Sequence, residues 1–276
     1  MLYLVATPIG NLEDITLRAL KVLKSVEILA CEDTRNTQKL LNHYEITGKK
    51  LISYHEHNEE KTSEKIISYL EEGREVALVT DAGMPCISDP GYILVEKIKK
   101  AGLPITTLPG ANAGLTALVA SGIESYNYTF YGFLPRKSKD LKLKLEEILK
   151  MNTTSILYES PYRVKNLVEE ISKISPTRKI SVARELTKMF EQIETSSAEE
   201  ILEMLGNKIK EKGEFVVIIS PNKDEKSEEV NVDELVELIY QKVQNGEKKS
   251  EAIKNISKKF GINKKEVYSL YHEKYD

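Results

Sequence analysis

Residues 76–91 read Val76-Ala77-Leu78-Val79-Thr80-Asp81-Ala82-Gly83-Met84-Pro85-Cys86-Ile87-Ser88-Asp89-Pro90-Gly91, and this stretch says most about the fold. Its first four residues are apolar and predict a buried strand, and a helical pattern starts at Gly91. Between them, two prolines and two glycines force the backbone into a tight loop that carries two carboxylates. Open α/β sheets bind ligands at the carboxyl ends of their strands. The stretch therefore predicts an enzyme with a preformed cofactor or substrate pocket.

The composition fits an ordinary globular protein with room for two domains, since 41% of residues are hydrophobic and 30% are charged. The net charge of -3 neither favours nor excludes a nucleic-acid partner. The two cysteines, Cys31 and Cys86, lack metal-ligand spacing, so we expect no metal site and no disulfide framework. No segment offers the roughly 20 apolar residues of a membrane span. We therefore expect a cytoplasmic protein that does not enter a membrane.

Strand and helix patterns alternate in the first part of the chain, which predicts a mostly parallel α/β domain over residues 1–125. The expected strands are 2–6, 28–31, 51–53, 76–80 and 105–108, and the expected helices are 15–26, 34–43, 58–72, 91–101 and 111–120.

A second α/β domain with a mixed sheet is expected over residues 126–221. Its strands are predicted at 128–133, 155–158, 179–184, 190–193 and 215–219, and its helices at 138–150, 162–174 and 198–211. Residues 222–231 are charged and almost free of apolar side chains, which predicts a linker. Residues 232–276 form a helical tail whose two last helices, around Gly261-Ile262-Asn263, resemble a helix-turn-helix.

Several loops at strand ends carry polar groups, although no GxGxxG or GxxxxGK[ST] motif for nucleotide phosphates occurs. Glu32-Asp33-Thr34-Arg35 is either a capped helix start or an ion pair that can contact phosphate. Pro109 to Gly114 opens a helix of small residues, which suits close approach of a ligand to the backbone or tight helix packing. His55 and His57 lack a third ligand, so polar substrate contacts are favoured over a metal.

A basic run follows the predicted strand 128–133. Residues 136–144 carry five cations and one acid. Such a run forms either a solvated helix face or a patch that contacts the phosphates of a nucleic acid.

Eight motifs together resemble the bacterial small-subunit rRNA (cytidine-2′-O)-methyltransferases, a group of the tetrapyrrole-methylase-like (class III) S-adenosylmethionine methyltransferases. The resemblance covers about residues 1–220, and its motifs are specific jointly and not singly. The motifs lie at 7–15, 31–35, 54–59, 80–85, 88–91, 109–113, 132–136 and 159–163.

The resemblance implies two α/β domains of the tetrapyrrole methylase type, with S-adenosylmethionine in the cleft between them. It further implies a homodimer and, as substrate, 16S rRNA in the assembled small ribosomal subunit, methylated on the ribose of a decoding-centre cytidine. By motif position the cofactor contacts are Pro8, Ile9, Asp81, Met84, Ile87, Ala111, Asn112, Ala113, Tyr158, Ala183, Glu214 and Phe215.

A ribose hydroxyl is a weak nucleophile, so a base or polarising group should lie near it. The candidates, which the sequence does not rank, are Asp14, Asp33, Glu159 and Glu185. Four arginines are expected either to hold RNA phosphates or to fix these acids: Arg18, Arg35, Arg163 and Arg184. Three further cations are expected to flank the cleft and bind RNA: Arg136, Lys137 and Lys139.

Two other functions remain open. A methyltransferase of the same fold could act on a tetrapyrrole precursor, although the cationic run favours RNA. A ligand-sensing regulator could bind DNA through residues 248–276. Its second helix would then need base-reading Arg, Gln or Asn side chains, whereas it offers Lys264, Lys265, Glu266 and Tyr268. We therefore expect no DNA partner, and expect the tail to bind RNA nonspecifically or to pack on the body.

Overall fold

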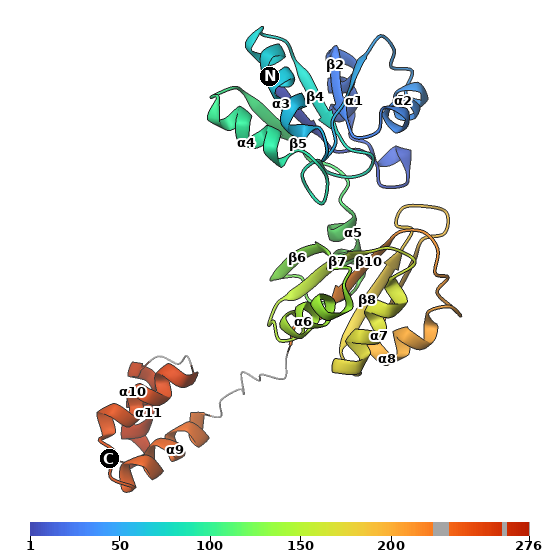
Figure 1. Cartoon of the computed structure of the whole chain (residues 1–276). Coiled ribbons are helices and arrows are strands. Elements are labelled where there is room, and N and C mark those ends of the chain that lie inside the picture. Colours follow the sequence, from blue (N-terminus) through green and yellow to red (C-terminus); the bar gives the residue numbers. More distant parts are fainter. Residues whose placement is uncertain (223–231, 261–263, 276) are drawn as a thin grey trace. The chain divides into compact units, whose positions relative to one another are not determined.

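The computed structural model describes residues 1–222, 232–260 and 264–275. The chain divides into two compact units, Met1–Pro221 and Asn222–Asp276. The first unit contains two five-stranded sheets, and the described residues of the second form three helices (Figure 1).

The first sheet is parallel throughout, with strand order β3-β2-β4-β1-β5. Strands β2 and β4 are buried along their whole length, as strands covered on both faces are. The predicted parallel sheet is therefore confirmed. The strand bounds are β1 Leu2–Val5, β2 Ile28–Cys31, β3 Lys50–Ser53, β4 Val76–Val79 and β5 Ile105–Leu108.

Helices cover both faces of this sheet. Helices α1 (Leu17–Ser25) and α2 (Thr34–His43) pack on one face through one apolar cluster, and α3 (Glu59–Glu71) and α4 (Tyr92–Lys100) pack on the other. Each fully buried Leu or Ile side chain in these clusters contributes about 1.5–3 kcal/mol. Because the helices hold both faces, the loops at the carboxyl ends of the strands are the part of this half left free to form a site.

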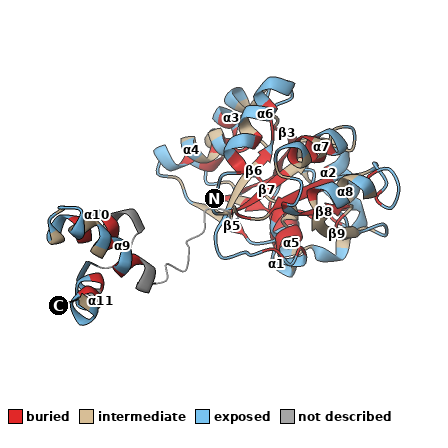
Figure 2. Cartoon of the chain, turned by 90° about the horizontal axis from the view of Figure 1, so that it is seen from below, coloured by how far each residue is buried: buried red, intermediate tan, exposed pale blue. Residues whose placement is uncertain are grey.

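The second sheet has the order β6-β7-β10-β8-β9 and is mixed, as predicted, because only β6 and β7 run parallel. Its strands are β6 Tyr128–Phe133, β7 Thr154–Glu159, β8 Lys179–Arg184, β9 Gln192–Ser197 and β10 Phe215–Ile219. Helices α6 (Ser138–Ile148), α7 (Val164–Ile174) and α8 (Ala198–Met204) share one apolar cluster with it. The inner strands β7, β8 and β10 are buried over most of their length, and Figure 2 shows exposed outer faces on the helices.

Helix α5 (Ala113–Ala120) follows β5 in the sequence but packs against the second sheet. Its Ala117 and Leu118 join Ile156, Val216 and Ile218 in a separate apolar cluster. Figure 1 shows α5 beside β7 and β10. The helix is apolar on nearly all sides, so it can pack on this sheet and still leave apolar side chains outside.

Two predicted elements differ from the structure. The helix expected over 198–211 ends at Met204, because Leu205 pairs with Ile209 and Gly206 takes a left-handed backbone. The strand expected over 190–193 lies instead at Gln192–Ser197. This edge strand has little hydrophobic alternation, and its pairing with β8 decides its position.

The second unit confirms the predicted helical tail, with α9 Val232–Gln244, α10 Lys249–Phe260 and α11 Lys264–Tyr275 around their own apolar core. The predicted linker lies outside the described residues except for Asn222, and so does the predicted turn at 261–263. Within the described parts of the chain, none of the helices has the length and apolar character needed to span a bilayer.

Candidate functional site

A cleft of about 350 Å³ lies between the carboxyl ends of the strands of the first sheet and a set of strand ends and loops of the second sheet. The first unit has two halves, one built on each sheet. The first half contributes the loops after β1, β4 and β5 to the cleft. The second half contributes the ends of β6 and β7, the loop after β8 and the start of β10. Of the predicted cofactor contacts, those that line this cleft are Ile9, Met84, Ile87, Asn112, Ala113, Tyr158, Glu214 and Phe215.

Four predicted contacts lie elsewhere. Pro8 and Asp81 line a neighbouring pocket of about 170 Å³. Ala111 and Ala183 belong to the apolar cluster that α5 shares with the second sheet. A cofactor role stays a prediction for all twelve residues, and the eight that line the cleft are the ones grouped in one cavity.

The loop after β4 turns Ile87 toward the cleft through an unusual backbone. Cys86 and Ser88, on either side of it, have φ values of 72° and 64°, although neither is a glycine. Gly91 has a φ of 139°, and a Cβ there would lie 2.7 Å from the Cys86 Sγ. Thr7 and Gly83 exchange backbone hydrogen bonds of 2.9 and 3.0 Å, which tie this loop to the loop after β1. Strained backbone of this kind concentrates at ligand sites.

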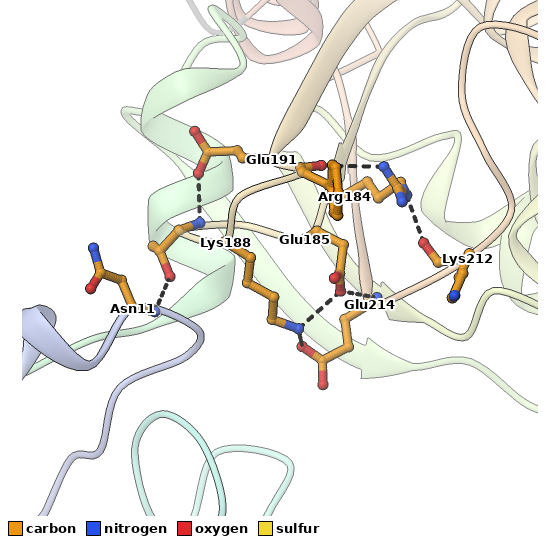
Figure 3. A network of polar contacts seen from close by, with 9 residues as sticks. Asn11, Arg184, Glu185, Lys188, Glu191, Lys212 and Glu214 are labelled. Atoms are coloured by element: carbon orange, nitrogen blue, oxygen red, sulfur yellow. Dashed lines mark hydrogen bonds and ion pairs between the residues drawn. The ribbon is translucent and has the colours of Figure 1, made fainter. Parts of the chain in front are cut away.

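The opposite wall of the cleft also has a lining residue flanked by two non-glycine residues with positive φ. Glu185 and Thr187 have φ values of 51° and 63° and flank Leu186, which lines the cleft. The Asn11 amide donates a 2.9 Å hydrogen bond to the Thr187 Oγ1, so the two halves touch here (Figure 3). A Cβ on Gly10 would lie 2.5 Å from the Lys188 Cγ and 2.8 Å from the Leu186 carbonyl oxygen. Glycine permits this close approach.

A polar network, hereafter the 184–214 network, holds that wall in place (Figure 3). The Lys188 Nζ donates to Glu185 Oε1 and to Glu214 Oε2, both at 2.9 Å. The Arg184 guanidinium donates to the carbonyl oxygens of Lys212 and Phe190 at 2.6 and 3.2 Å. Arg184 therefore acts in this structure as a brace between two loops.

Glu185, one of the predicted proton acceptors, takes part in that network through its Oε1. Its Oε1 also accepts a 3.1 Å hydrogen bond from the Glu214 amide. Burial raises the pKa of Glu185, but the hydrogen bonds from Lys188 and from the Glu214 backbone lower it, and the net shift is downward. A carboxylate stabilised in this way accepts a proton poorly.

Glu159 and Arg163 form a second fixed pair at the cleft. The Glu159 Oε1 accepts a 2.7 Å hydrogen bond from the Ser160 amide, and its Oε2 lies 3.5 Å from the Arg163 Nη2. The same Nη2 donates to the Pro135 carbonyl at 2.9 Å. Arg163 thus holds the loop after β6 by a hydrogen bond and lies against Glu159, whose buried Oε2 has no hydrogen-bond partner among the described residues.

In the first half, Asp33 caps α2 and its carboxylate binds the Arg35 guanidinium, with an Nη2 to Oδ2 distance of 2.6 Å. These hydrogen bonds lower the pKa of Asp33 to about 2. Asp81 accepts a 3.2 Å hydrogen bond from the Asp33 amide and one of 2.8 Å from the Asn36 Nδ2. Asp14 and Arg18 are exposed and do not line the cleft.

One carboxylate in the cleft was not among the predicted proton acceptors. Asp89 lines the cleft, and burial, reinforced by the charge of Glu32, raises its pKa to about 7 although a hydrogen bond with Thr80 opposes the shift. Burial and the charge of Asp81 also raise the pKa of Glu32. A signal for Asp89 existed in the motif Ser88-Asp89-Pro90-Gly91, but its burial against other acids is a property of the fold.

The predicted basic run divides into two parts. Lys142 pairs with Glu170 at 3.4 Å and Lys144 pairs with Glu147 at 2.8 Å. The described residues offer no ion-pair partner to the exposed side chains of Arg136, Lys137 and Lys139. These three cations follow Phe133, a cleft residue that is 60% exposed.

Comparisons with known proteins agree with this geometry. The family model described as Tetrapyrrole (Corrin/Porphyrin) Methylases matches residues 1–202. A Halalkalibacterium halodurans protein named Ribosomal RNA small subunit methyltransferase I is 45% identical over 275 residues, 99% of this chain and 94% of the relative. A protein of that name from a Hydrogenobaculum species is 48% identical over 220 residues, 79% of this chain and 95% of the relative.

The crystal structure of uroporphyrin-III-C-methyltransferase from Thermus thermophilus gives a TM-score of 0.53 at 18% identity, over 79% of this chain and 93% of that one, which shows a shared fold. The family resemblance seen in the sequence motifs is thus confirmed. The chain belongs to the tetrapyrrole (corrin/porphyrin) methylase family, on the branch of the ribosomal RNA small subunit methyltransferases I.

Proposed function

We propose that this protein transfers a methyl group from S-adenosylmethionine to the ribose 2′-oxygen of a decoding-centre cytidine in the 16S rRNA of the small ribosomal subunit. The observation that carries the proposal is the cleft between the two sheets, because strained, strand-end loops of both halves build it. The name of the relatives, Ribosomal RNA small subunit methyltransferase I, supplies the class of substrate.

The lining of the cleft suits a cationic nucleoside. Ile9, Met84, Ile87 and Leu186 give apolar walls, and the rings of Phe133 and Tyr158 give π faces. Aromatic faces and carboxylates attract a sulfonium cation. When bound, S-adenosylmethionine would supply an electrophilic methyl group. The apolar walls exclude water, and alignment of the reacting atoms can lower such a barrier by up to about 7–11 kcal/mol.

Two features favour RNA over a tetrapyrrole as the acceptor. The side chains of Arg136, Lys137 and Lys139 are exposed, and phosphates of a nucleic acid would bind them. Phe133 lies beside them at the edge of the cleft, and unstacked bases of folded RNA stack on such rings. Because the relatives' name refers to the small subunit, we propose an assembled particle as the substrate, and the cytoplasm as the site of action.

The homodimer implied by the family resemblance is part of the proposal. Helix α5 leaves Leu115 and Val119 exposed, with Tyr126 beyond its end, and these side chains would suit contact with a second copy. Light scattering of the purified protein should give twice the monomer mass. A monomer mass at all concentrations would contradict the proposed homodimer and leave the rest of the proposal intact.

A transfer assay with tritiated methyl donor tests the proposed reaction. We expect transfer to small ribosomal subunits that lack the modification, slower transfer to the same RNA without its proteins, and none to uroporphyrinogen. Transfer to uroporphyrinogen alone would replace the RNA proposal with the tetrapyrrole one. Equal rates on particles and naked RNA would contradict the requirement for an assembled subunit.

A further inference from the structure

A second groove adjoins the cleft on the first half of the molecule. It has a volume of about 620 Å³, and its lining includes Glu32, His55, Asp89 and Tyr92. The two cavities share two lining residues, Ser88 and Asp89. The loop at 88–89 therefore forms the wall between the proposed donor cleft and an open groove beside it.

Asp89 stands in this wall in an acidic, partly buried setting. Glu32 from the loop after β2 and Asp81 from the loop after β4 act on its charge, and the Thr80 side chain forms a hydrogen bond with it. The charge of Asp89 in turn helps to raise the pKa of Cys86, in the same loop, and of Tyr158 in β7. None of these five groups is a cation, so Asp89 differs from the acids that an arginine or lysine holds ionised.

The other candidate acids are placed less well to take a proton from an acceptor. Arg35 binds Asp33, and Lys188 binds Glu185. Glu159 lies beside Arg163 and accepts from the Ser160 amide. Asp14 is exposed and lines neither the cleft nor the groove.

We propose that the acceptor nucleotide enters the groove and that the Asp89 carboxylate takes the proton of its attacking 2′-hydroxyl. This inference rests on the proposed function and deepens it. The hydroxyl oxygen forms a bond with the methyl carbon, the carbon–sulfur bond breaks, and its electron pair stays on sulfur. The hydroxyl proton passes to Asp89, which becomes a neutral acid and later returns the proton to water. Tyr92 is 68% exposed in the groove lining and would support an unstacked base.

The test compares the wild type with Asp89→Asn, Asp89→Glu and the control Glu96→Gln. Glu96 lies on α4, exposed and paired with Lys100 at 3.0 Å, so its change removes one charge from the same half without touching either cavity. Calorimetry measures the affinity for S-adenosylmethionine. Single-turnover transfer to small subunits at saturating donor, from pH 5.5 to 9, measures the chemical step separately from binding.

We expect Asp89→Asn to bind the donor within a few-fold of the wild type and to lose about 100- to 10,000-fold in transfer rate. The wild-type rate should rise with pH to a plateau, with its midpoint near the raised pKa of about 7, and Asp89→Asn should lose this rise. Asp89→Glu should keep part of the rate and the pH dependence, and Glu96→Gln should match the wild type.

Two outcomes separate this inference from the proposed function. Transfer by Asp89→Asn at the wild-type rate, with an unchanged pH profile, would overturn the role of Asp89 and leave the methyltransferase proposal standing. Donor binding by the wild type without transfer to any RNA would overturn the proposed function and this inference together.

Discussion

At the scale of single residues, Asp89 has a consequence for stability that is independent of catalysis. Its pKa is raised in the folded protein, so its ionised form opposes folding. This cost is absent below the ordinary pKa of 3.8, grows as the pH rises and is complete above about 7. The unliganded protein should therefore lose stability from this group between those two values.

Asp89→Asn removes that cost and should raise the melting temperature more at pH 8 than at pH 5. Because Asp89 is partly exposed, we expect a difference of only about 1 kcal/mol, or roughly 2–4 °C. Thermal unfolding of both proteins at the two pH values measures it. An equal gain at both values would show that Asp89 has no raised pKa in the folded state.

Gly10→Ala tests the contact between the two halves. A Cβ would meet the Leu186 carbonyl oxygen at 2.8 Å, and backbone cannot move aside as a flexible side chain can. We expect about 1–3 kcal/mol of lost stability and weaker donor binding, because Leu186 lines the cleft. Gly48→Ala is the matched control, since its Cβ meets no atom and only its φ of 73° adds strain. Equal donor affinity in both variants would contradict a role for this contact.

The sequence identified loops well and side-chain environments poorly. Prolines, glycines and polar residues after strands marked the loop at 80–91, because such residues set backbone geometry locally. The raised pKa of Asp89 comes first from its burial and then from the charge of Glu32, which lies 57 positions away in the chain. The bracing role of Arg184 depends on Lys212. Contacts between distant positions decide both, so no local pattern reports them.

At the scale of elements, the basic run at residues 136–144 leads to a prediction about RNA binding that can be tested separately from donor binding. Arg136→Ala with Lys137→Ala should weaken binding of ribosomal particles, most strongly at low salt, and reduce the salt dependence of that binding by about two phosphate contacts. The affinity for S-adenosylmethionine should not change, since neither residue lines the cleft.

Lys142→Ala is the control for that double variant, because Lys142 already pairs with Glu170. Filter binding at several salt concentrations measures the effect. The same salt slope in the double variant and the wild type would exclude Arg136 and Lys137 from contact with RNA phosphates.

Elements with strong hydrophobic periodicity were predictable, and those fixed by pairing were not. Strand β4 is four apolar residues bounded by a loop, and its position follows from the sequence. Strand β9 is Gln-Ile-Glu-Thr-Ser-Ser at the sheet edge, where the register with β8 fixes it. Helix α8 ends early because the chain turns at Gly206. Residues 208–211 continue the helical sequence pattern, so the pattern alone does not reveal this turn.

At the scale of the whole molecule, the described residues of the second unit form an apolar core of their own. A chain that ends at Pro221 should therefore keep the cleft and bind S-adenosylmethionine within about twofold of the full chain. Calorimetry on the two proteins measures this. Loss of donor binding in the shortened chain would show that the cleft needs residues beyond Pro221.

We propose above all that the cleft between the two sheets delivers a methyl group to a ribose oxygen of small-subunit rRNA. Mass-spectrometric mapping of 16S rRNA tests it most directly, on subunits from cells that lack this protein, before and after incubation with the purified protein and S-adenosylmethionine. We predict that one 2′-O-methylated cytidine appears at the decoding centre. An unchanged methylation map, or a new methyl group on a base, would contradict the account.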